Sequence, residues 1–177
     1  MKVSFSKKNS PTVYLATDHA GFELKEKVKK FLAGEGYGVE DCGAYEFDKN
    51  DDYPDFISKA AQEVSKDPAN RAIVFGSSGQ GEAMVANKYK NVRAAIFYTP
   101  CIPAHNVDMK GRQSQNPFEM IRLTREHNDA NVLSLGAKIL KEEDALKAVK
   151  LWLQTPFTNE ERHARRIEKI KKIEQNQ

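Results

Sequence analysis

The chain has 177 residues, of which 40% are hydrophobic, and this is enough to build one α/β domain with a real core. Its net charge of +3 comes from acids and bases mixed along the sequence, which is not the charge pattern of a dedicated nucleic-acid-binding protein. Two cysteines exclude a disulfide framework and a zinc cluster, and no apolar run approaches the ~18 residues of a membrane span, so we expect a cytoplasmic protein that binds neither nucleic acid nor membrane.

Residues 1–11 are polar and are expected to form a flexible N-terminal tail. Beyond them, short apolar runs alternate with amphipathic helical patterns. The expected strands cover residues 12–17, 37–42, 72–75, 92–98 and 131–135, and helical patterns begin near Phe22, Tyr53, Glu82, Asn116 and Glu142. This alternation calls for a five-stranded parallel sheet with helices on both faces, in one domain over residues 12–157. In such a sheet, ligands bind beyond the carboxyl ends of the strands.

A glycine-rich turn joins the third expected strand to its helix. The turn consists of Gly76, Ser77, Ser78, Gly79, Gln80 and Gly81, and Glu82 then opens the helix. The glycines let the backbone turn sharply, so that its N–H groups can bind a negative charge beside a carboxylate suited to proton transfer. The helix position would lower the pKa of Glu82 and burial would raise it, and the sequence leaves this balance open. The plain alternative is an ordinary βα turn with a capping glutamate.

A long polar loop over residues 99–116 follows the fourth expected strand. Loops of this length are more often functional or mobile than plain connectors. Asn116 and Pro117 then carry the pattern of a helix start, and Glu119 stands where it would complete a capping box.

The C-terminal segment, residues 158–177, predicts a basic helix. Its only sustained apolar stripe is Ile167, Ile170 and Ile173. This stripe is too narrow for the helix to be stable alone, so we expect it to pack on another surface, most plausibly that of a second subunit.

Five motifs then occur in an order that resembles a known family. They are Asp18-His19-Ala20-Gly21-Phe22, Asp52-Tyr53-Pro54, the stretch from Gly76 to Lys88, Arg125-Glu126-His127-Asn128-Asp129-Ala130-Asn131, and Arg162-His163-x-x-Arg166. Together they resemble the type B ribose-5-phosphate isomerases and the related galactose-6-phosphate isomerase subunits, over nearly the whole chain.

The resemblance implies a Rossmann-like three-layer αβα sandwich and a homodimer, or a tetramer of such dimers, with active sites shared between subunits. It implies an aldose–ketose isomerisation that interconverts D-ribose 5-phosphate and D-ribulose 5-phosphate without metal or cofactor. Asp18 and His19 match the family's substrate-binding pair, and residues 76–81 match its anion hole. His127 matches the histidine that opens the sugar ring, Asn128 a neighbouring substrate contact, and Arg162 and Arg166 the pair that holds the phosphate.

The chain also departs from the family pattern. The better-known branch has a catalytic cysteine where this chain has Gly76, whereas a second branch uses a glutamate at the position of Glu82, and this chain resembles that branch. Lys138 replaces a third substrate-binding arginine, which keeps the charge and loses the bidentate fork. The loop 99–116 is longer than in common members and could change the preferred substrate.

Other interpretations remain open. The substrate could be a six-carbon sugar phosphate of the allose- or galactose-6-phosphate type, or the protein could bind sugar phosphates without catalysis. Asp18 could simply cap a helix, and His127 could simply favour a helix C-terminus. Arg162 and Arg166 lie on one helical face, which is often just solvated.

Overall fold

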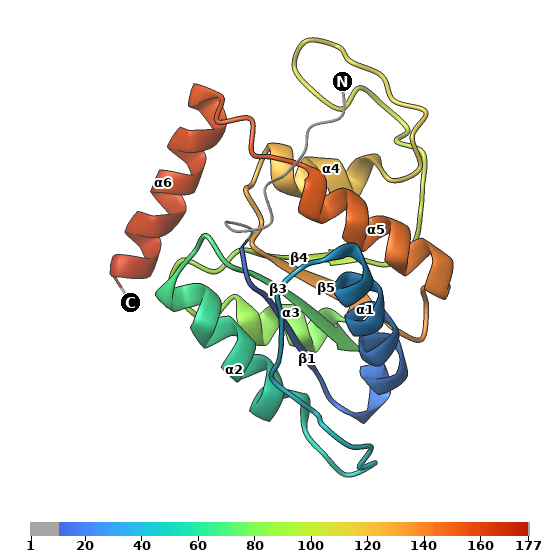
Figure 1. The fold of residues 1–177 in the computed structure, drawn as a ribbon. Coiled ribbons are helices and arrows are strands. Elements are labelled where there is room, and N and C mark those ends of the chain that lie inside the picture. Colours follow the sequence, from blue (N-terminus) through green and yellow to red (C-terminus); the bar gives the residue numbers. More distant parts are fainter. Residues whose placement is uncertain (1–10, 177) are drawn as a thin grey trace.

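The computed structural model describes residues 11–176, so the predicted tail over residues 1–11 lies outside the described residues except for Pro11. The chain forms a five-stranded sheet in which every pair of neighbours is parallel, in the order β2-β1-β3-β5-β4 (Figure 1). The strands are β1 (Val13–Thr17), β2 (Val39–Asp41), β3 (Arg71–Gly76), β4 (Ala94–Phe97) and β5 (Val132–Gly136). The prediction of a five-stranded parallel sheet is confirmed.

Helices cover both faces of the sheet and complete the three-layer sandwich (Figure 1). They are α1 (Phe22–Glu35), α2 (Tyr53–Lys66), α3 (Gln80–Ala86), α4 (Glu119–Glu126), α5 (Glu142–Gln154) and α6 (Glu161–Gln175), with a short 3₁₀ turn at His19–Gly21. One core cluster joins the sheet to α1, α4 and α5 around the fully buried Trp152. A second, smaller cluster joins the opposite face to α2 and α3. The central strands β1, β3 and β5, whose side chains are almost all buried, therefore pack against an apolar layer on each face, as a buried parallel sheet requires.

The connection order creates a switch point between β1 and β3. From β1 the chain crosses to β2 on one side, and then returns to β3 on the other side of β1. The loops that leave β1 and β3 therefore diverge over opposite faces of the sheet and open a crevice at their carboxyl ends. β3 and β5 pair in register from Ala72 with Val132 to Gly76 with Gly136, so their carboxyl ends lie side by side.

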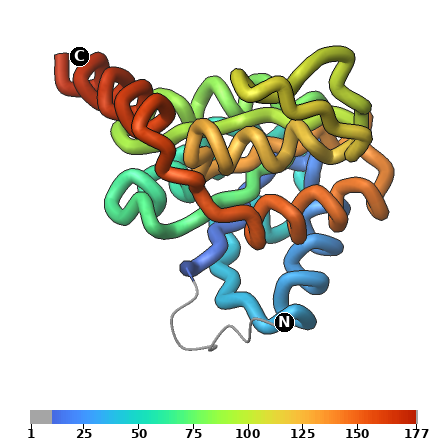
Figure 2. Tube along the Cα trace, turned by 90° about the horizontal axis from the view of Figure 1, so that it is seen from above, coloured from blue at the N-terminus to red at the C-terminus, as the bar shows by residue number. Residues whose placement is uncertain are grey.

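The C-terminal helix α6 projects away from the sheet at one end of the molecule (Figure 2). Of its predicted apolar stripe, Ile167 is buried, whereas Ile170 is 45% exposed and Ile173 is 61% exposed. Near its C-terminal end the helix contacts the rest of the chain through Glu174, whose carboxylate accepts a hydrogen bond from the Asn91 N–H at 2.9 Å. The stripe is thus only partly covered within one chain. In residues 11–176, no helix combines the length and the apolar character needed to cross a membrane.

The predicted capping box at the start of α4 is wrong. The helix begins at Glu119, and the Asn116 side chain accepts from the Phe118 N–H at 3.0 Å in a preceding turn. The Glu119 carboxylate is 1% exposed and instead receives the Arg112 guanidinium at 2.6 Å and the Ser114 hydroxyl at 2.8 Å. These bonds fold the loop 99–116 onto α4.

Candidate active site

The glycine-rich turn leaves β3 at Gly76 and is pinned to the end of β5. The Ala137 N–H donates to the Gly76 carbonyl at 2.8 Å, the Lys138 N–H donates to the Ser77 carbonyl at 3.1 Å, and the Ser134 hydroxyl donates to the Gly79 carbonyl at 2.6 Å. In a trans peptide the N–H points opposite to the carbonyl of the same unit. The N–H groups that follow these three carbonyls therefore point away from β5.

Gly79 has a φ of +77°, in the left-handed region that glycine adopts without strain. Gly81 is also constrained, because an added Cβ would lie 2.7 Å from the Tyr53 hydroxyl. The phenol of Tyr53, at the start of α2, therefore lies over the turn.

Glu82 reaches back from α3 to the end of β3. A Cβ built on Gly76 would lie 1.8 Å from Glu82 Oε1 and 2.0 Å from Cδ, so the carboxylate occupies the space that a side chain at residue 76 would need. Glu82 is only 4% exposed. Burial raises its pKa, and the nearby Asp18 carboxylate raises it further, against the lowering effect of its own backbone N–H. The net effect is a raised pKa, which the sequence alone could not decide, so the Glu82 carboxylate is a stronger base than an ordinary glutamate.

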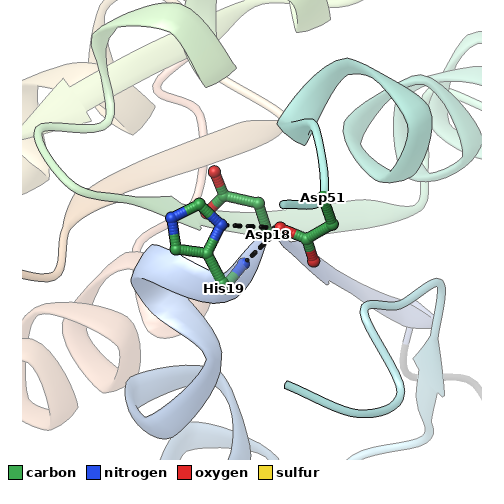
Figure 3. Close-up of side chains that lie close together, drawn as sticks. All are labelled: Asp18, His19 and Asp51. Atoms are coloured by element: carbon green, nitrogen blue, oxygen red, sulfur yellow. Dashed lines mark hydrogen bonds and ion pairs between the residues drawn. The ribbon is translucent and has the colours of Figure 1, made fainter. Parts of the chain in front are cut away.

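Asp18, His19 and Asp51 meet where β1 ends (Figure 3). Asp18 is buried, and its Oδ1 accepts from the Ala20 N–H at 2.9 Å, so it does cap the short 3₁₀ turn as the plain interpretation predicted. Asp51 comes from the loop between β2 and α2 and contacts the His19 ring at 2.7 Å. His19, Phe47 and Lys138 line a cavity of about 160 Å³ beside this cluster.

We call these residues the strand-end cluster. It contains Asp18, His19, Asp51, the turn 76–81, Glu82 and Lys138, all of which follow the carboxyl ends of β1, β3 and β5 or reach back to them.

A second group lies elsewhere, and we call it the His127 cluster. Its members are His127, Asn128, Arg162, His163 and Arg166, which line a pocket of about 330 Å³ together with residues 106–109 of the long loop. The His127 and His163 rings stack with centroids 4.2 Å apart and an angle of 11° between their planes. Burial lowers the pKa of His163, and His127 and Arg162 lower it further.

The two clusters lie at opposite ends of the strands. His127 ends α4 just before β5 begins, whereas Lys138 follows the carboxyl end of the same strand. A strand of five residues spans about 16 Å. The site residues predicted from the sequence are therefore brought together as two groups within one chain, and not as one.

Four residues near these clusters have no role predicted from the sequence: Asp51, Phe47, Tyr53 and His163. Tyr53 and His163 lie within two of the five sequence motifs, and their place in those motifs is the signal that could have identified them. Asp51 and Phe47 belong to a polar loop whose composition resembles any surface connector, so nothing in the sequence singled them out.

The fold and the site define a doubly wound α/β protein with a glycine-rich turn and a buried acid at its switch point. Residues 13–109 and 115–170 match the model of the Ribose/Galactose Isomerase family. The chain belongs to this family.

Curated relatives and solved structures agree with this assignment. Ribose-5-phosphate isomerase B of Mycolicibacterium paratuberculosis is 36% identical over 92% of this chain and 91% of its own length. The crystal structure of ribose-5-phosphate isomerase B from Mycoplasma genitalium with bound ribulose-5-phosphate has a TM-score of 0.82 at 32% identity, over 95% of this chain and 99% of that one. The Thermotoga maritima ribose 5-phosphate isomerase has a TM-score of 0.77 at 37% identity, over 93% of this chain and 99% of that one.

Proposed function

We propose that the protein interconverts D-ribose 5-phosphate and D-ribulose 5-phosphate with Glu82 as the catalytic base. The observation that carries the proposal is the buried Glu82 carboxylate held against Gly76, beside a turn with outward N–H groups at the switch point. The family, and the named activity of the relatives, supply the reaction class.

Aldose–ketose isomerisation moves a proton between neighbouring carbons through an enediolate. It needs a base above the carbon acid and hydrogen-bond donors that face the developing oxyanion. Glu82 supplies the base, and its raised pKa strengthens it. The N–H groups of the turn 76–81 supply the donors, while Asp18 and His19 hold the substrate hydroxyls from the β1 side.

A thiol base does not fit this chain. Gly76 carries no side chain, and Cys42 packs against the α2 side of the sheet. Burial, with help from the Asp41 and Glu40 carboxylates, raises the pKa of Cys42 to about 11, which leaves little thiolate near neutral pH. Cys101 is exposed in the long loop. These observations favour the glutamate branch of the family.

The His127 cluster completes the site from a second subunit in this proposal. His127 opens the sugar ring, Asn128 contacts the substrate, and Arg162 and Arg166 hold the phosphate, since paired guanidinium groups suit a dianion. Two features support a shared site. Within one chain the clusters lie at opposite ends of the strands, and Ile170 and Ile173 remain exposed on α6. A homodimer places one cluster of each kind in each site.

Mixing two inactive variants tests the shared site. Glu82→Gln and His127→Asn proteins, each nearly inactive alone, regain activity when they are denatured and refolded together, because a mixed dimer contains one site in which both residues are native. The measurement is the ribulose 5-phosphate formed per unit of protein, with each variant refolded alone as the control. No gain on mixing contradicts a site built from two subunits.

Replacing Arg162 or Arg166 by Ala raises KM for ribose 5-phosphate about tenfold or more, since each loses a charge-assisted contact worth roughly 1.5–3 kcal/mol. Arg165→Ala is the matched control, because Arg165 lies on the same helix, is exposed, and pairs with Glu161 at 3.4 Å. Steady-state kinetics and competition by inorganic phosphate measure the effect. Equal behaviour of all three variants favours a merely solvated arginine face.

An isomerase assay on a panel of five- and six-carbon aldose phosphates tests the function as a whole. Ribose 5-phosphate is expected to have the highest kcat/KM. A preference for a six-carbon sugar phosphate replaces the proposed substrate and keeps the reaction. Binding of these sugars without any turnover makes the protein a sugar-phosphate binder and overturns the proposal.

A further inference from the structure

Asp51 holds His19 through two hydrogen bonds to a single oxygen. Its Oδ1 accepts from the His19 backbone N–H at 2.9 Å and lies 2.7 Å from His19 Nδ1 (Figure 3). An ionised carboxylate can only accept, so Nδ1 carries a proton in this contact. Nε2 is then the free ring nitrogen, and Figure 3 shows it on the side of the ring away from Asp51.

The surroundings of Asp51 and His19 restrict movement. The Asp51 side chain is 10% exposed, whereas that of His19 is 35% exposed and lines the strand-end cavity. The Phe47 ring meets the imidazole edge-on, with centroids 6.2 Å apart and an angle of 85° between the planes. The carboxylate is therefore the buried partner and the imidazole is the exposed one.

The loop that carries Asp51 is anchored at both ends. At its start, the fully buried Lys25 ammonium donates to the Asp41 carboxylate at 2.7 Å and to the Ala44 carbonyl at 2.6 Å. Near its end, the Asp51 N–H donates to the Asp48 carbonyl at 3.1 Å, and the Asp48 carboxylate accepts from the Asn50 N–H at 2.9 Å. Asp51 therefore lies beside His19 in a loop that hydrogen bonds hold at both ends.

We propose that Asp51 is a positioning residue that fixes the His19 imidazole with Nδ1–H toward its own carboxylate and presents Nε2–H to the sugar-phosphate substrate. The inference rests on the proposed function for its substrate. A carboxylate behind a histidine sets its tautomer and its orientation and favours the imidazolium form. His19 then acts as a cationic donor to a substrate oxygen.

Several other charged groups surround His19. Asp18 faces it from the end of β1, and Glu23, Lys27, Lys138 and Glu142 line the same cavity from α1, the segment after β5, and α5. Lys27 is paired with Glu142 at 2.8 Å, which leaves Lys138 as the opposing cation among these residues. The Asp51 hydrogen bond is the largest cause of a raised His19 pKa, ahead of Asp18. The Nε2–H donor therefore persists to higher pH than in a free histidine.

The direct test is an NMR titration of the His19 ring nitrogens in the full chain. In the unchanged protein, Nδ1 stays protonated and Nε2 titrates, with a pKa above that of an ordinary histidine. Asp51→Asn brings that pKa down, and Asp52→Asn, the matched control at an exposed neighbour without a side-chain cap bond, leaves it in place. Titration at Nδ1 in the unchanged protein overturns the proposal without recourse to any variant.

Kinetics separate positioning from simple support of the fold. Asp51→Asn raises KM for ribose 5-phosphate about tenfold, since a charged hydrogen-bond partner is lost, while Asp52→Asn does not. In a His19→Ala background the same Asp51→Asn change adds less than about twofold, because residues that act as one unit are not additive. Fully additive losses overturn the proposal. If no sugar phosphate is turned over, the proposed function fails, and the NMR titration still decides the role of Asp51.

Discussion

Glu82→Gln removes isomerase turnover, with kcat lower by at least about a hundredfold, the size expected for the loss of a general base. The amide keeps the shape of the side chain and cannot accept the carbon-bound proton. Binding of ribose 5-phosphate stays within a few-fold, because Glu82 contributes to chemistry more than to affinity. Steady-state kinetics give kcat, and calorimetry gives the dissociation constant. Turnover within tenfold of the unchanged protein removes Glu82 as the base.

The raised pKa of Glu82 adds two checks. Glu82 acts as a base only when ionised, so kcat falls as the pH drops through its pKa, and a raised pKa starts this fall at a higher pH than an ordinary glutamate would. A buried charge with a raised pKa also opposes folding at neutral pH. Glu82→Gln is therefore expected to match or exceed the unchanged protein in melting temperature, so lost activity cannot be ascribed to unfolding.

Gly76→Ala lowers kcat almost as strongly as Glu82→Gln does, although it adds only one methyl group. The new Cβ would lie 1.8 Å from Glu82 Oε1, and the flexible carboxylate must move away because the strand cannot. A displacement of about 1 Å at a catalytic group can cost about a hundredfold in rate, and we expect a loss of this size in kcat. Rate measurements and a melting curve test the prediction.

The matched control is Gly34→Ala, at an exposed helical glycine of α1 where an added Cβ meets nothing within 4 Å. That variant keeps full activity and gains up to about 1 kcal/mol of stability, since alanine favours helix. If Gly76→Ala is equally active, Glu82 does not depend on the space that Gly76 leaves free.

The fold was predictable because its signals are local. Apolar strand runs alternate with amphipathic helices, and the central strands and the helices α2 and α5 bury the residues that their periods predict. The interpretation failed where a distant partner competes for a side chain. Glu119 has the position of a capping residue, but Arg112 from the long loop forms an ion pair with it, and a charged pair outweighs one capping bond. The fourth strand is shorter than expected for a different, local reason: the Val92 N–H donates to the Tyr89 carbonyl in a turn, and the strand begins only at Ala94.

The sequence motifs name candidate site residues one by one, but they do not give the arrangement of those residues in space. The motifs name Asp18, Glu82 and His127 as candidates. Their spacing along the chain does not tell at which end of the strands each residue lies, because the strand order differs from the chain order. The direction of the Glu82 pKa shift depends on how deeply the folded chain buries the carboxylate, because burial and the helix position act in opposite directions. Asp51 was missed because a single carboxylate in a polar loop has no periodicity to mark it.

The contact between Gly76 and Glu82 constrains how such a site can change over evolutionary time. A side chain at residue 76 and a carboxylate extended from residue 82 compete for one volume, so the two positions form an epistatic pair. Gly76→Cys alone places a thiol in the volume that the Glu82 carboxylate occupies, and shortening Glu82 alone removes the proposed base. We therefore expect exchange between thiol and carboxylate chemistry to proceed by changes at both positions rather than at either one.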